Sequence, residues 1–180
     1  MIAGDAKGRR LRSVGDQSVR PMTDQIREAL FSTLGESVPG ARFLDLYAGS
    51  GAVGIEALSR GASHATFVES DRAARDAIES NLDVTGFEGR AEVVGSDAGR
   101  FAETFDGLPF DLAVVDPPFA AGLPSGVLET MVRRGVVSQE AQVVVRISTR
   151  LAAPEQPAGL RLGTTRKYGD STLLYFSAAR

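Results

Sequence analysis

A glycine-rich turn at residues 45–51 (DLYAGSG) constrains the fold of this chain more than any other stretch. The preceding residues 42–44 follow a Pro-Gly pair and end in two apolar side chains, which predicts a short buried strand. The pattern of residues 53–59 predicts a helix that ends at Gly61. A strand that runs through two glycines into a helix brings its backbone close to a ligand and directs the first helical N–H groups at it. This arrangement is typical of the first nucleotide-binding turn of a doubly wound α/β sheet.

The glycine spacing alone leaves the ligand open between NAD and S-adenosylmethionine. Residues 49–54 (GSGAVG) satisfy the G-x-G-x-x-G dinucleotide pattern, which is weak by itself. Glu69 ends the next predicted strand, where its carboxylate would hold the ribose hydroxyls of either ligand. Asp45 separates the two, because a carboxylate in this tight turn would repel a pyrophosphate but suits an ammonium and a sulfonium group. The residues therefore favour S-adenosylmethionine.

Strands and helices alternate along the rest of the chain. The apolar run at 110–115 predicts a central strand. Consecutive β-α units followed by a terminal hairpin predict a mostly parallel α/β sheet with an antiparallel edge. The predicted strands occupy 42–44, 65–69, 91–94, 110–115, 141–147, 160–167 and 172–177, and the helices that alternate with them occupy 53–59, 71–85, 99–105 and 127–134.

Composition limits the class of protein. A chain of 180 residues with 43% hydrophobic and 24% charged residues predicts one globular unit. The absence of cysteine excludes disulfides, zinc–thiolate sites and cysteine nucleophiles. No apolar run approaches the ~20 residues that cross a bilayer, and no secretory signal is visible, so we expect a soluble, cytoplasmic monomer without membrane or metal partners. The single histidine, His64, is expected to lie at the surface or in loop packing.

Both ends of the chain are basic. Residues 1–42 and 146–180 carry more Lys and Arg than Asp and Glu, whereas residues 43–145 are acidic. If the two ends meet in space, they form a positive surface that suits a polyanion.

The N-terminal residues predict an arm and a helix. Residues 1–20 are rich in arginine and broken by glycine, which indicates an extended or hairpin arm that grips phosphates, with a solvated tail as the alternative. Thr23 is a predicted N-cap, and the helix that follows it carries an apolar stripe and ends at Gly35, with Arg27 placed off the stripe. We therefore divide the chain into a nucleic-acid-binding arm and helix at 1–38 and a second region at 39–180. The candidate nucleic-acid contacts are Lys7, Arg9, Arg10, Arg12, Arg20, Thr23 and Arg27.

A second motif, Asp116-Pro117-Pro118-Phe119, follows the predicted strand at 110–115. Its position at a carboxyl end places it beside the glycine-rich turn, across the crevice where such sheets bind ligands. The prolines fix the backbone and donate no hydrogen bonds, so nearby carbonyls point outward as acceptors. Asp116 adds a carboxylate acceptor and Phe119 a flat ring, which together suit an exocyclic amine on a planar base.

These motifs resemble those of the S-adenosylmethionine-dependent amino-methyltransferases, which share an Asp/Asn-Pro-Pro-aromatic motif. The resemblance is carried by residues 45–51, Glu69, Asp97 and residues 116–119. Further blocks resemble the bacterial family that methylates N2 of a guanine in 16S ribosomal RNA, and the resemblance runs nearly end to end. Those blocks lie at 2–11, 20–31, 54–62 and 168–171.

The resemblance implies that residues 39–180 form an S-adenosylmethionine-dependent methyltransferase domain with a Rossmann-like, seven-stranded sheet. It further implies that the protein acts on 16S ribosomal RNA or a small ribosomal subunit particle. The residues it implies for cofactor binding are Asp45, Tyr47, Ala48, Gly49, Ser50, Gly51, Glu69, Ser70, Asp97 and Ala98, and those for the amine are Asp116, Pro117, Pro118 and Phe119.

Three positions depart from the family pattern. Met22 and Ser171 stand where the family usually has threonine, and Arg146 stands where the fifth strand tends to end in an acid. We expect none of the three to touch the cofactor or the amine.

The mechanism expected from these residues is direct displacement. Asp116 and the Pro117 carbonyl would accept the two N–H bonds of the amine and aim its lone pair at the methyl group, while Phe119 stacks on an extruded base. Adenine in nucleic acid and glutamine in a protein are alternative acceptors. An NAD-dependent oxidoreductase and a non-catalytic RNA-binding module are alternatives of other classes.

Overall fold

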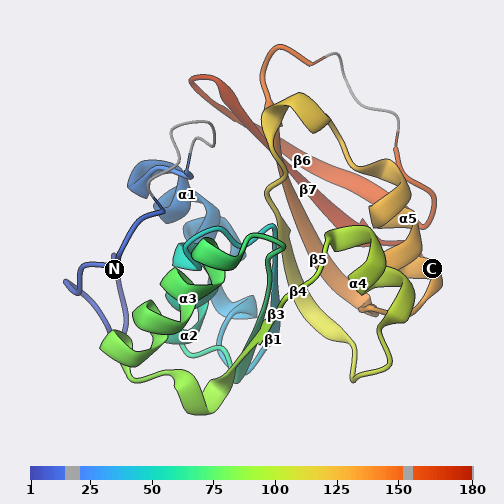
Figure 1. Cartoon of the computed structure of the whole chain (residues 1–180). Helices are drawn as coiled ribbons and strands as arrows, with labels where there is room; N and C mark the ends of the chain where they lie inside the picture. Colours follow the sequence, from blue (N-terminus) through green and yellow to red (C-terminus); the bar gives the residue numbers. More distant parts are fainter. Residues whose placement is uncertain (15–20, 152–155, 180) are drawn as a thin grey trace.

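The computed structural model describes residues 1–14, 21–151 and 156–179. A single seven-stranded sheet runs in the order β3-β2-β1-β4-β5-β7-β6 (Figure 1). The pairs among β1 to β5 are parallel, whereas β7 pairs antiparallel with both β5 and β6. The predicted mostly parallel sheet with a C-terminal antiparallel hairpin is therefore confirmed. The strands are β1 Arg42–Leu46, β2 His64–Val68, β3 Ala91–Val94, β4 Phe110–Val115, β5 Val137–Ser148, β6 Leu160–Tyr168 and β7 Ser171–Ala178.

Helices cover both faces of the sheet. On one face lie α1 (Asp24–Leu34), α2 (Ala52–Ser59) and α3 (Arg72–Thr85), and on the other lie α4 (Ala98–Thr104) and α5 (Ser125–Arg133) (Figure 1). Two apolar clusters fill the interfaces, because successive side chains of a strand point to opposite faces. In β1, Phe43 joins the first cluster and Leu44 the second.

The predicted elements differ from the structure mainly at their ends. Strand β5 begins at Val137 and not at residue 141, because Val137 already pairs with Phe110 of β4. The strand then passes through an irregularity before Gln142 pairs with Leu112. Short 3-10 helices at Gly35–Ser37, Glu88–Arg90 and Phe119–Ala121 were not expected from the sequence pattern.

The described part of the N-terminal arm packs against α2 and α3. The buried carboxylate of Glu56 accepts hydrogen bonds from the backbone N–H groups of Ile2 and Ala3, at 2.9 and 3.0 Å. Ala6 is buried, and Asn81 of α3 exchanges two hydrogen bonds with the backbone of Arg12. Residues 1–14 are therefore a bound strap and not a solvated tail.

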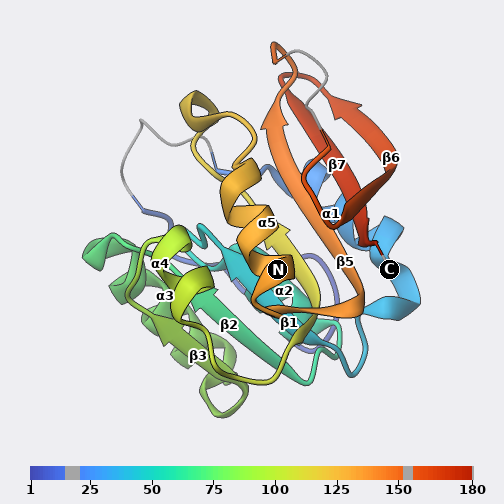
Figure 2. The same cartoon turned by 90° about the vertical axis from the view of Figure 1, so that its right-hand side faces the viewer.

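The order of the strands creates a crevice between β1 and β4. The chain leaves β1 toward β2 and β3, and then returns to place β4 on the other side of β1 (Figure 2). Ligands of open α/β sheets bind at such switch points, at the carboxyl ends of the strands. The N–H of Asp116 donates to the carbonyl of Leu46 at 3.1 Å, which joins the two motifs directly. Among the described residues, no helix is long and apolar enough to cross a bilayer.

Candidate active site

A cavity of about 590 Å³ opens at the carboxyl ends of the central strands. Its size lies within the range of small-molecule sites. The glycine-rich turn, the end of β2, the Asp-Pro-Pro-Phe segment and the entrance to α1 all contribute to its wall. The lining residues are Ser13, Val14, Pro21, Met22, Tyr47, Ala48, Gly49, Ser50, Ala52, Val53, Glu69, Ser70, Asp71, Ala74, Asp116, Pro117, Pro118, Phe119 and Arg146.

The turn after β1 holds a strained backbone. Tyr47 has φ of 65°, and within the described ranges no other residue except glycine has a positive φ. The N–H groups of Tyr47 and Ala48 both donate to the carbonyl of Val68 at 3.1 Å, which fixes this conformation. Strain of this kind is typical of functional sites. Here the strained turn forms the part of the cavity wall that follows β1.

Gly54 serves the packing of α2 on the sheet. A Cβ at this position would lie 2.3 Å from the ring of Phe67, so only glycine lets the helix approach β2 this closely. The third glycine of the G-x-G-x-x-G pattern therefore reflects helix–sheet contact and does not select a dinucleotide.

Glu69 is positioned by two backbone groups. One carboxylate oxygen accepts from the N–H of Gly49 at 2.8 Å and the other from the N–H of Asp71 at 2.9 Å. Each carboxylate oxygen retains a lone pair that can accept from a hydroxyl group. Glu69 and the neighbouring Ser70 both lie in the cavity wall, where the sequence predicted them.

Asp45 lies beneath the turn and not in the cavity wall, which corrects the expectation that its carboxylate faces the ligand. Its side chain is buried and accepts a hydrogen bond from the N–H of Gly54 at 2.8 Å. Burial raises the pKa of Asp45 to about 8, although the bond from Gly54 opposes this shift. The reason is the strand alternation, because position 45 points to the face that α2 covers. Gly51 is also buried and outside the lining.

Asp97 and Ala98 lie at the end of β3, also outside the lining residues. The carboxylate of Asp97 accepts from the N–H of Arg100 at 2.9 Å and so caps α4, while Ala98 is buried in the second apolar cluster. The pKa of Tyr47 is raised, first by burial and then by the charge of Asp97. Asp97 therefore lies near the cavity without forming its wall.

Asp116 meets an arginine that the sequence did not single out as a site residue. Nη1 of Arg146 lies 2.9 and 3.2 Å from the two carboxylate oxygens of Asp116. Burial raises the pKa of Asp116 to about 6, even though the charge of Arg146 lowers it. The Arg146 guanidinium also lies over the ring of Phe119, 4.8 Å from its centre.

The expectation that none of the three departures from the family pattern touches the site is therefore wrong for Arg146 and Met22, whereas Ser171 lies outside the lining residues. Arg146 contacts two residues of the Asp-Pro-Pro-Phe segment, Ser171 accepts a hydrogen bond from Arg146 Nε at 3.1 Å, and Met22 lines the cavity. A charged residue inside the apolar run of β5 was the only signal of this role in the sequence.

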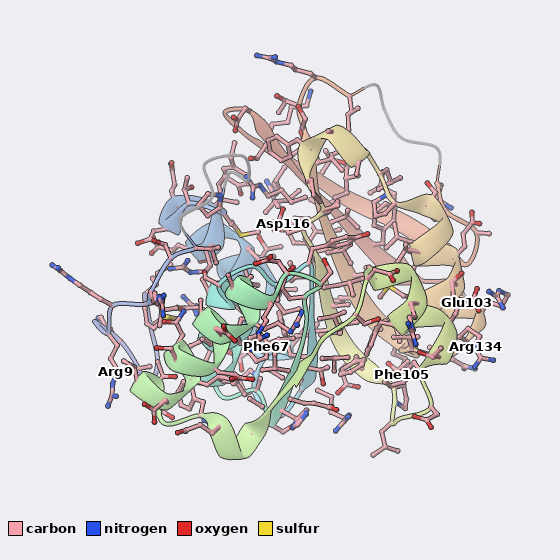
Figure 3. All side chains as sticks on the ribbon, in the orientation of Figure 1. Arg9, Phe67, Glu103, Phe105, Asp116 and Arg134 are labelled. Atoms are coloured by element: carbon pink, nitrogen blue, oxygen red, sulfur yellow. The ribbon has the colours of Figure 1, made fainter. Side chains whose placement is uncertain are left out.

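The candidate nucleic-acid contacts divide into exposed and buried residues. Lys7, Arg9, Arg10 and Arg12 are exposed on the strap, and a guanidinium nitrogen of Arg9 donates to the carbonyl of Val84. Figure 3 shows Arg9 at the outer edge of the molecule and Asp116 between its two halves.

Of the remaining candidate contacts, Thr23 precedes α1 and Arg27 lies within it. Thr23 is exposed, and its hydroxyl caps α1 as predicted. Arg27 is a correction, because it lies on the apolar side of α1, is 6% exposed and pairs with Asp24 at 2.9 Å. Its spacing from Leu30 and Leu34 places it on the buried stripe. Arg20 lies outside the described residues.

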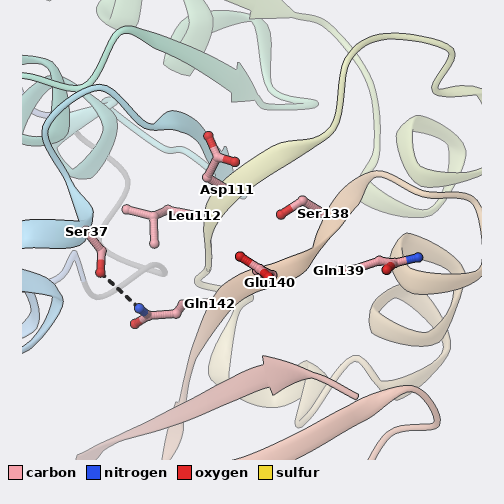
Figure 4. A pocket seen from close by; sticks show the side chains of 7 residues that line it. All are labelled: Ser37, Asp111, Leu112, Ser138, Gln139, Glu140 and Gln142. Carbon is pink, nitrogen blue, oxygen red and sulfur yellow. Dashed lines mark hydrogen bonds between the residues drawn. The ribbon is translucent and has the colours of Figure 1, made fainter. Parts of the chain in front are cut away.

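A second hollow lies at the amino ends of β4 and β5 (Figure 4). Its polar lining includes Ser37, whose hydroxyl accepts from the side chain of Gln142 at 3.0 Å. It lies at the amino ends of these strands, whereas Asp116 lies at the carboxyl end of β4, and we assign it no ligand. Over the described ranges, no group of three or more His, Cys, Asp or Glu side chains is arranged to hold a metal ion.

The fold and the site together define a Rossmann-like methyltransferase: the seven-stranded sheet places a glycine-rich turn and an Asp-Pro-Pro-Phe segment around one cavity. A family model described as "Conserved hypothetical protein 95" matches residues 1–177. The chain belongs to this family, which confirms the family predicted from the sequence.

Similar proteins agree with this assignment. Ribosomal RNA small subunit methyltransferase D of Escherichia coli (strain K12) is 38% identical over 170 residues, which cover 94% of this chain and 85% of that protein. The protein of the same name from Haemophilus influenzae is 31% identical over 169 residues, 92% of this chain and 88% of that protein. The solved structure of the Escherichia coli protein described as "Putative methyltransferase yhhF" is 35% identical, with a TM-score of 0.87 over 99% of this chain and 96% of that chain.

Proposed function

We propose that this protein transfers a methyl group from S-adenosylmethionine to the exocyclic N2 amine of a guanine in 16S ribosomal RNA. One observation carries the proposal: the acceptors of the Asp-Pro-Pro-Phe segment and the carboxylate of Glu69 line the same cavity. Relatives that share most of the chain are named as methyltransferases of small-subunit ribosomal RNA, which supports RNA as the substrate class.

The donor end of the cavity suits S-adenosylmethionine, which supplies an electrophilic methyl group when bound. Glu69 offers acceptors for ribose hydroxyls while the backbone of the turn holds it in place. Tyr47 and the backbone of residues 48–50 would complete the nucleoside site. Asp45 acts through the turn, since its carboxylate holds the first turn of α2 from below. Burial and then the charge of Asp97 raise the pKa of Tyr47, so the Asp97 carboxylate acts electrostatically at that end of the cavity.

The acceptor end suits a planar amine. Asp116 and the Pro117 carbonyl would each accept a hydrogen bond from one N–H group of the amine. This would direct the nitrogen lone pair toward the methyl donor. The nitrogen–methyl bond would form as the carbon–sulfur bond of the donor breaks, which would leave S-adenosylhomocysteine. The nitrogen would then carry the positive charge, and the carboxylate of Asp116 is preorganised to stabilise it. The resulting ammonium is acidic, so its proton passes readily to water. Phe119 offers a ring for stacking on an extruded base.

The strap is the proposed RNA-binding region, as residues 1–38 were assigned from the sequence. Four exposed basic side chains of the strap can contact phosphates: Lys7, Arg9, Arg10 and Arg12. Arg27 is no longer proposed as an RNA contact, because its guanidinium is buried and paired. The last two residues of the strap, Ser13 and Val14, lie in the cavity wall. RNA held by the strap would therefore reach the amine site along one surface.

Identification of the methylated nucleoside tests the proposal. Protein and labelled S-adenosylmethionine are incubated with 16S ribosomal RNA, with small-subunit particles and with ribosomal protein, and the RNA is digested to nucleosides. We expect label in N2-methylguanosine. Label in N6-methyladenosine or in protein would move the assignment to another amino-methyltransferase, and comparison of free RNA with particles identifies the preferred substrate.

A further inference from the structure

Arg146 lies near the carboxyl end of β5, where the register of the sheet places it beside the Asp-Pro-Pro-Phe segment. Val115 of β4 pairs with Val145 of β5, so the next residue of each strand, Asp116 and Arg146, lie side by side. The Arg146 side chain is only 3% exposed, and that of Asp116 is 18% exposed. This ion pair is therefore largely removed from water.

The guanidinium of Arg146 is held on three sides. Nη1 donates to both carboxylate oxygens of Asp116, Nε donates to the hydroxyl of the buried Ser171 at 3.1 Å, and the planar group covers one face of the Phe119 ring. One side chain thus contacts both the acceptor and the aromatic residue of the Asp-Pro-Pro-Phe segment. An exposed ion pair does not need such fixed geometry, and it contributes little.

Arg146 is also the counter-charge of an acidic cavity. The charged side chains among the described lining residues are Glu69, Asp71, Asp116 and Arg146, of which only Arg146 is basic. Asp45 of β1 faces Asp116 from beneath the turn, and Asp170 at the start of the β7 hairpin pairs with the hydroxyl of Ser171. Without Arg146, the carboxylate of Asp116 would face other acids and no cation among the lining residues that the structure describes.

We propose that Arg146 is a positioning residue for methyl transfer, which keeps Asp116 in its hydrogen-bond-accepting form and fixes the Phe119 ring so that its second face receives the base. This inference rests on the proposed role of Asp116 as the acceptor for the amine. A carboxylate has about four lone-pair sites, so the two bonds from Arg146 leave room for the amine. The guanidinium, the phenyl ring and the base would then stack in that order.

The sign of the pH effect follows from the surroundings of Asp116. Burial already raises its pKa to about 6, and the charge of Arg146 is the main influence that lowers it. Replacing Arg146 by a neutral residue raises the pKa of Asp116 further. A protonated carboxyl group donates a hydrogen bond where the amine needs an acceptor, so activity is lost first at low pH.

Single-turnover methyl transfer measured from about pH 5 to about pH 9 tests the inference. For Arg146→Gln we expect the acid limb to move to higher pH by about one unit, so that the rate falls ~10-fold more at the acid end than at the alkaline end. Arg146→Lys should restore part of the shift, because it keeps the charge but not the planar contacts. Arg161→Gln on the exposed side of β6 is the matched control and should leave the profile unchanged.

Two further variants protect the test against misfolding. Ser171→Ala removes the Nε contact of Arg146, together with the hydrogen bond that the Ser171 hydroxyl donates to Asp170, and should move the acid limb in the same direction by a smaller amount. In an Asp116→Asn background, Arg146→Gln should move no acid limb, since no carboxylate remains to be titrated. A loss of rate that is equal at every pH would mean a purely structural role, and an unchanged profile in Arg146→Gln would overturn the inference.

The outcomes also separate this inference from the proposed function. A shifted profile with label in a nucleoside other than N2-methylguanosine would retain Arg146 and reject the guanine target. Full activity of Asp116→Ala would reject the role of Asp116 and with it that of Arg146.

Discussion

Glu69 has two tasks, because the oxygens that face the cavity also hold the backbone of the glycine-rich turn. Its loss should therefore affect both the proposed ribose contact and the shape of the turn. We expect Glu69→Ala to weaken S-adenosylhomocysteine binding by ~1–3 kcal/mol, the usual cost of losing hydrogen bonds to a charged group. Calorimetry measures this, with NAD as the control ligand, which should not bind either protein.

Glu69→Gln refines this measurement. Its amide keeps one acceptor oxygen but introduces a donor opposite the N–H groups of Gly49 and Asp71. An intermediate affinity is expected. Wild-type affinity in Glu69→Ala, or tight binding of NAD, would contradict the assignment of this end of the cavity.

Asp116 carries the prediction for chemistry. Asp116→Ala should slow single-turnover methyl transfer by a factor of ~100 or more, if one preorganised acceptor is worth as much as one oxyanion-hole donor. Cofactor affinity should be retained, because Glu69 and the turn hold that end. Asp116→Asn keeps an acceptor but leaves the buried guanidinium of Arg146 without its carboxylate, so its thermal stability must be measured beside its rate.

At the scale of elements, the strap joins the N-terminus to the helical face without forming a helix or strand of its own. Glu56 of α2 and Asn81 of α3 bind its backbone, which leaves its basic side chains exposed. The backbone contacts fix the path of the strap, and the side chains are then available for a polyanion. Because the backbone holds the strap in place and the side chains stay exposed, the proposed RNA role can be tested separately from folding.

Neutralising Arg9, Arg10 and Arg12 to Gln should weaken RNA binding and flatten its salt dependence by roughly one unit of slope for each phosphate that the strap no longer binds. S-adenosylhomocysteine affinity should not change. A charge-matched control is Arg100→Gln with Arg133→Gln and Arg134→Gln, in α4 and at the end of α5, across the sheet from the strap; Figure 3 shows Arg134 and Arg9 on opposite sides. Equal RNA affinity and salt slope in both triple variants would contradict the role of the strap.

At the scale of the whole molecule, two buried acids make stability depend on pH. The folded-state pKa values of Asp45 and Asp116, about 8 and about 6, lie above the ordinary value of 3.8. Between pH 3.8 and the folded-state pKa of each acid, the folded protein therefore binds more protons than the unfolded chain. The stability contributed by each acid is lost as pH rises through its folded-state pKa. The cavity is thus maintained at some cost in stability at neutral and alkaline pH.

Asp45→Asn should remove the larger part of this dependence. An amide resembles the protonated carboxyl group, because it can still accept from Gly54 without ionising. Chemical denaturation at pH ~8 should show the variant more stable than wild type by on the order of 1 kcal/mol, with the difference shrinking toward pH ~5. The exposed Asp106→Asn is the control and should leave the pH dependence as it is. A variant less stable than wild type at pH ~8 would show that the charged form of Asp45 is the one that folding favours.

The order of the elements and the two motifs were determined by the sequence itself. Glycines at 49 and 51 and the prolines at 117 and 118 act through their own backbone restrictions, and apolar periodicity needs only a short stretch of chain. The helix cap at Thr23 is local in the same sense, so its prediction was confirmed.

Only the tertiary structure decided which side chains meet around the cavity. Asp116 and Arg146 are 30 residues apart, and they pair because β4 and β5 adopt one particular parallel register. Asp45 does not reach the cavity because it lies on the face of the sheet that α2 covers. Arg27 is buried because it lies on the apolar stripe of α1. Register and the choice of covered face depend on the packing of whole elements, and a one-residue shift would turn every side chain of a strand to the opposite face.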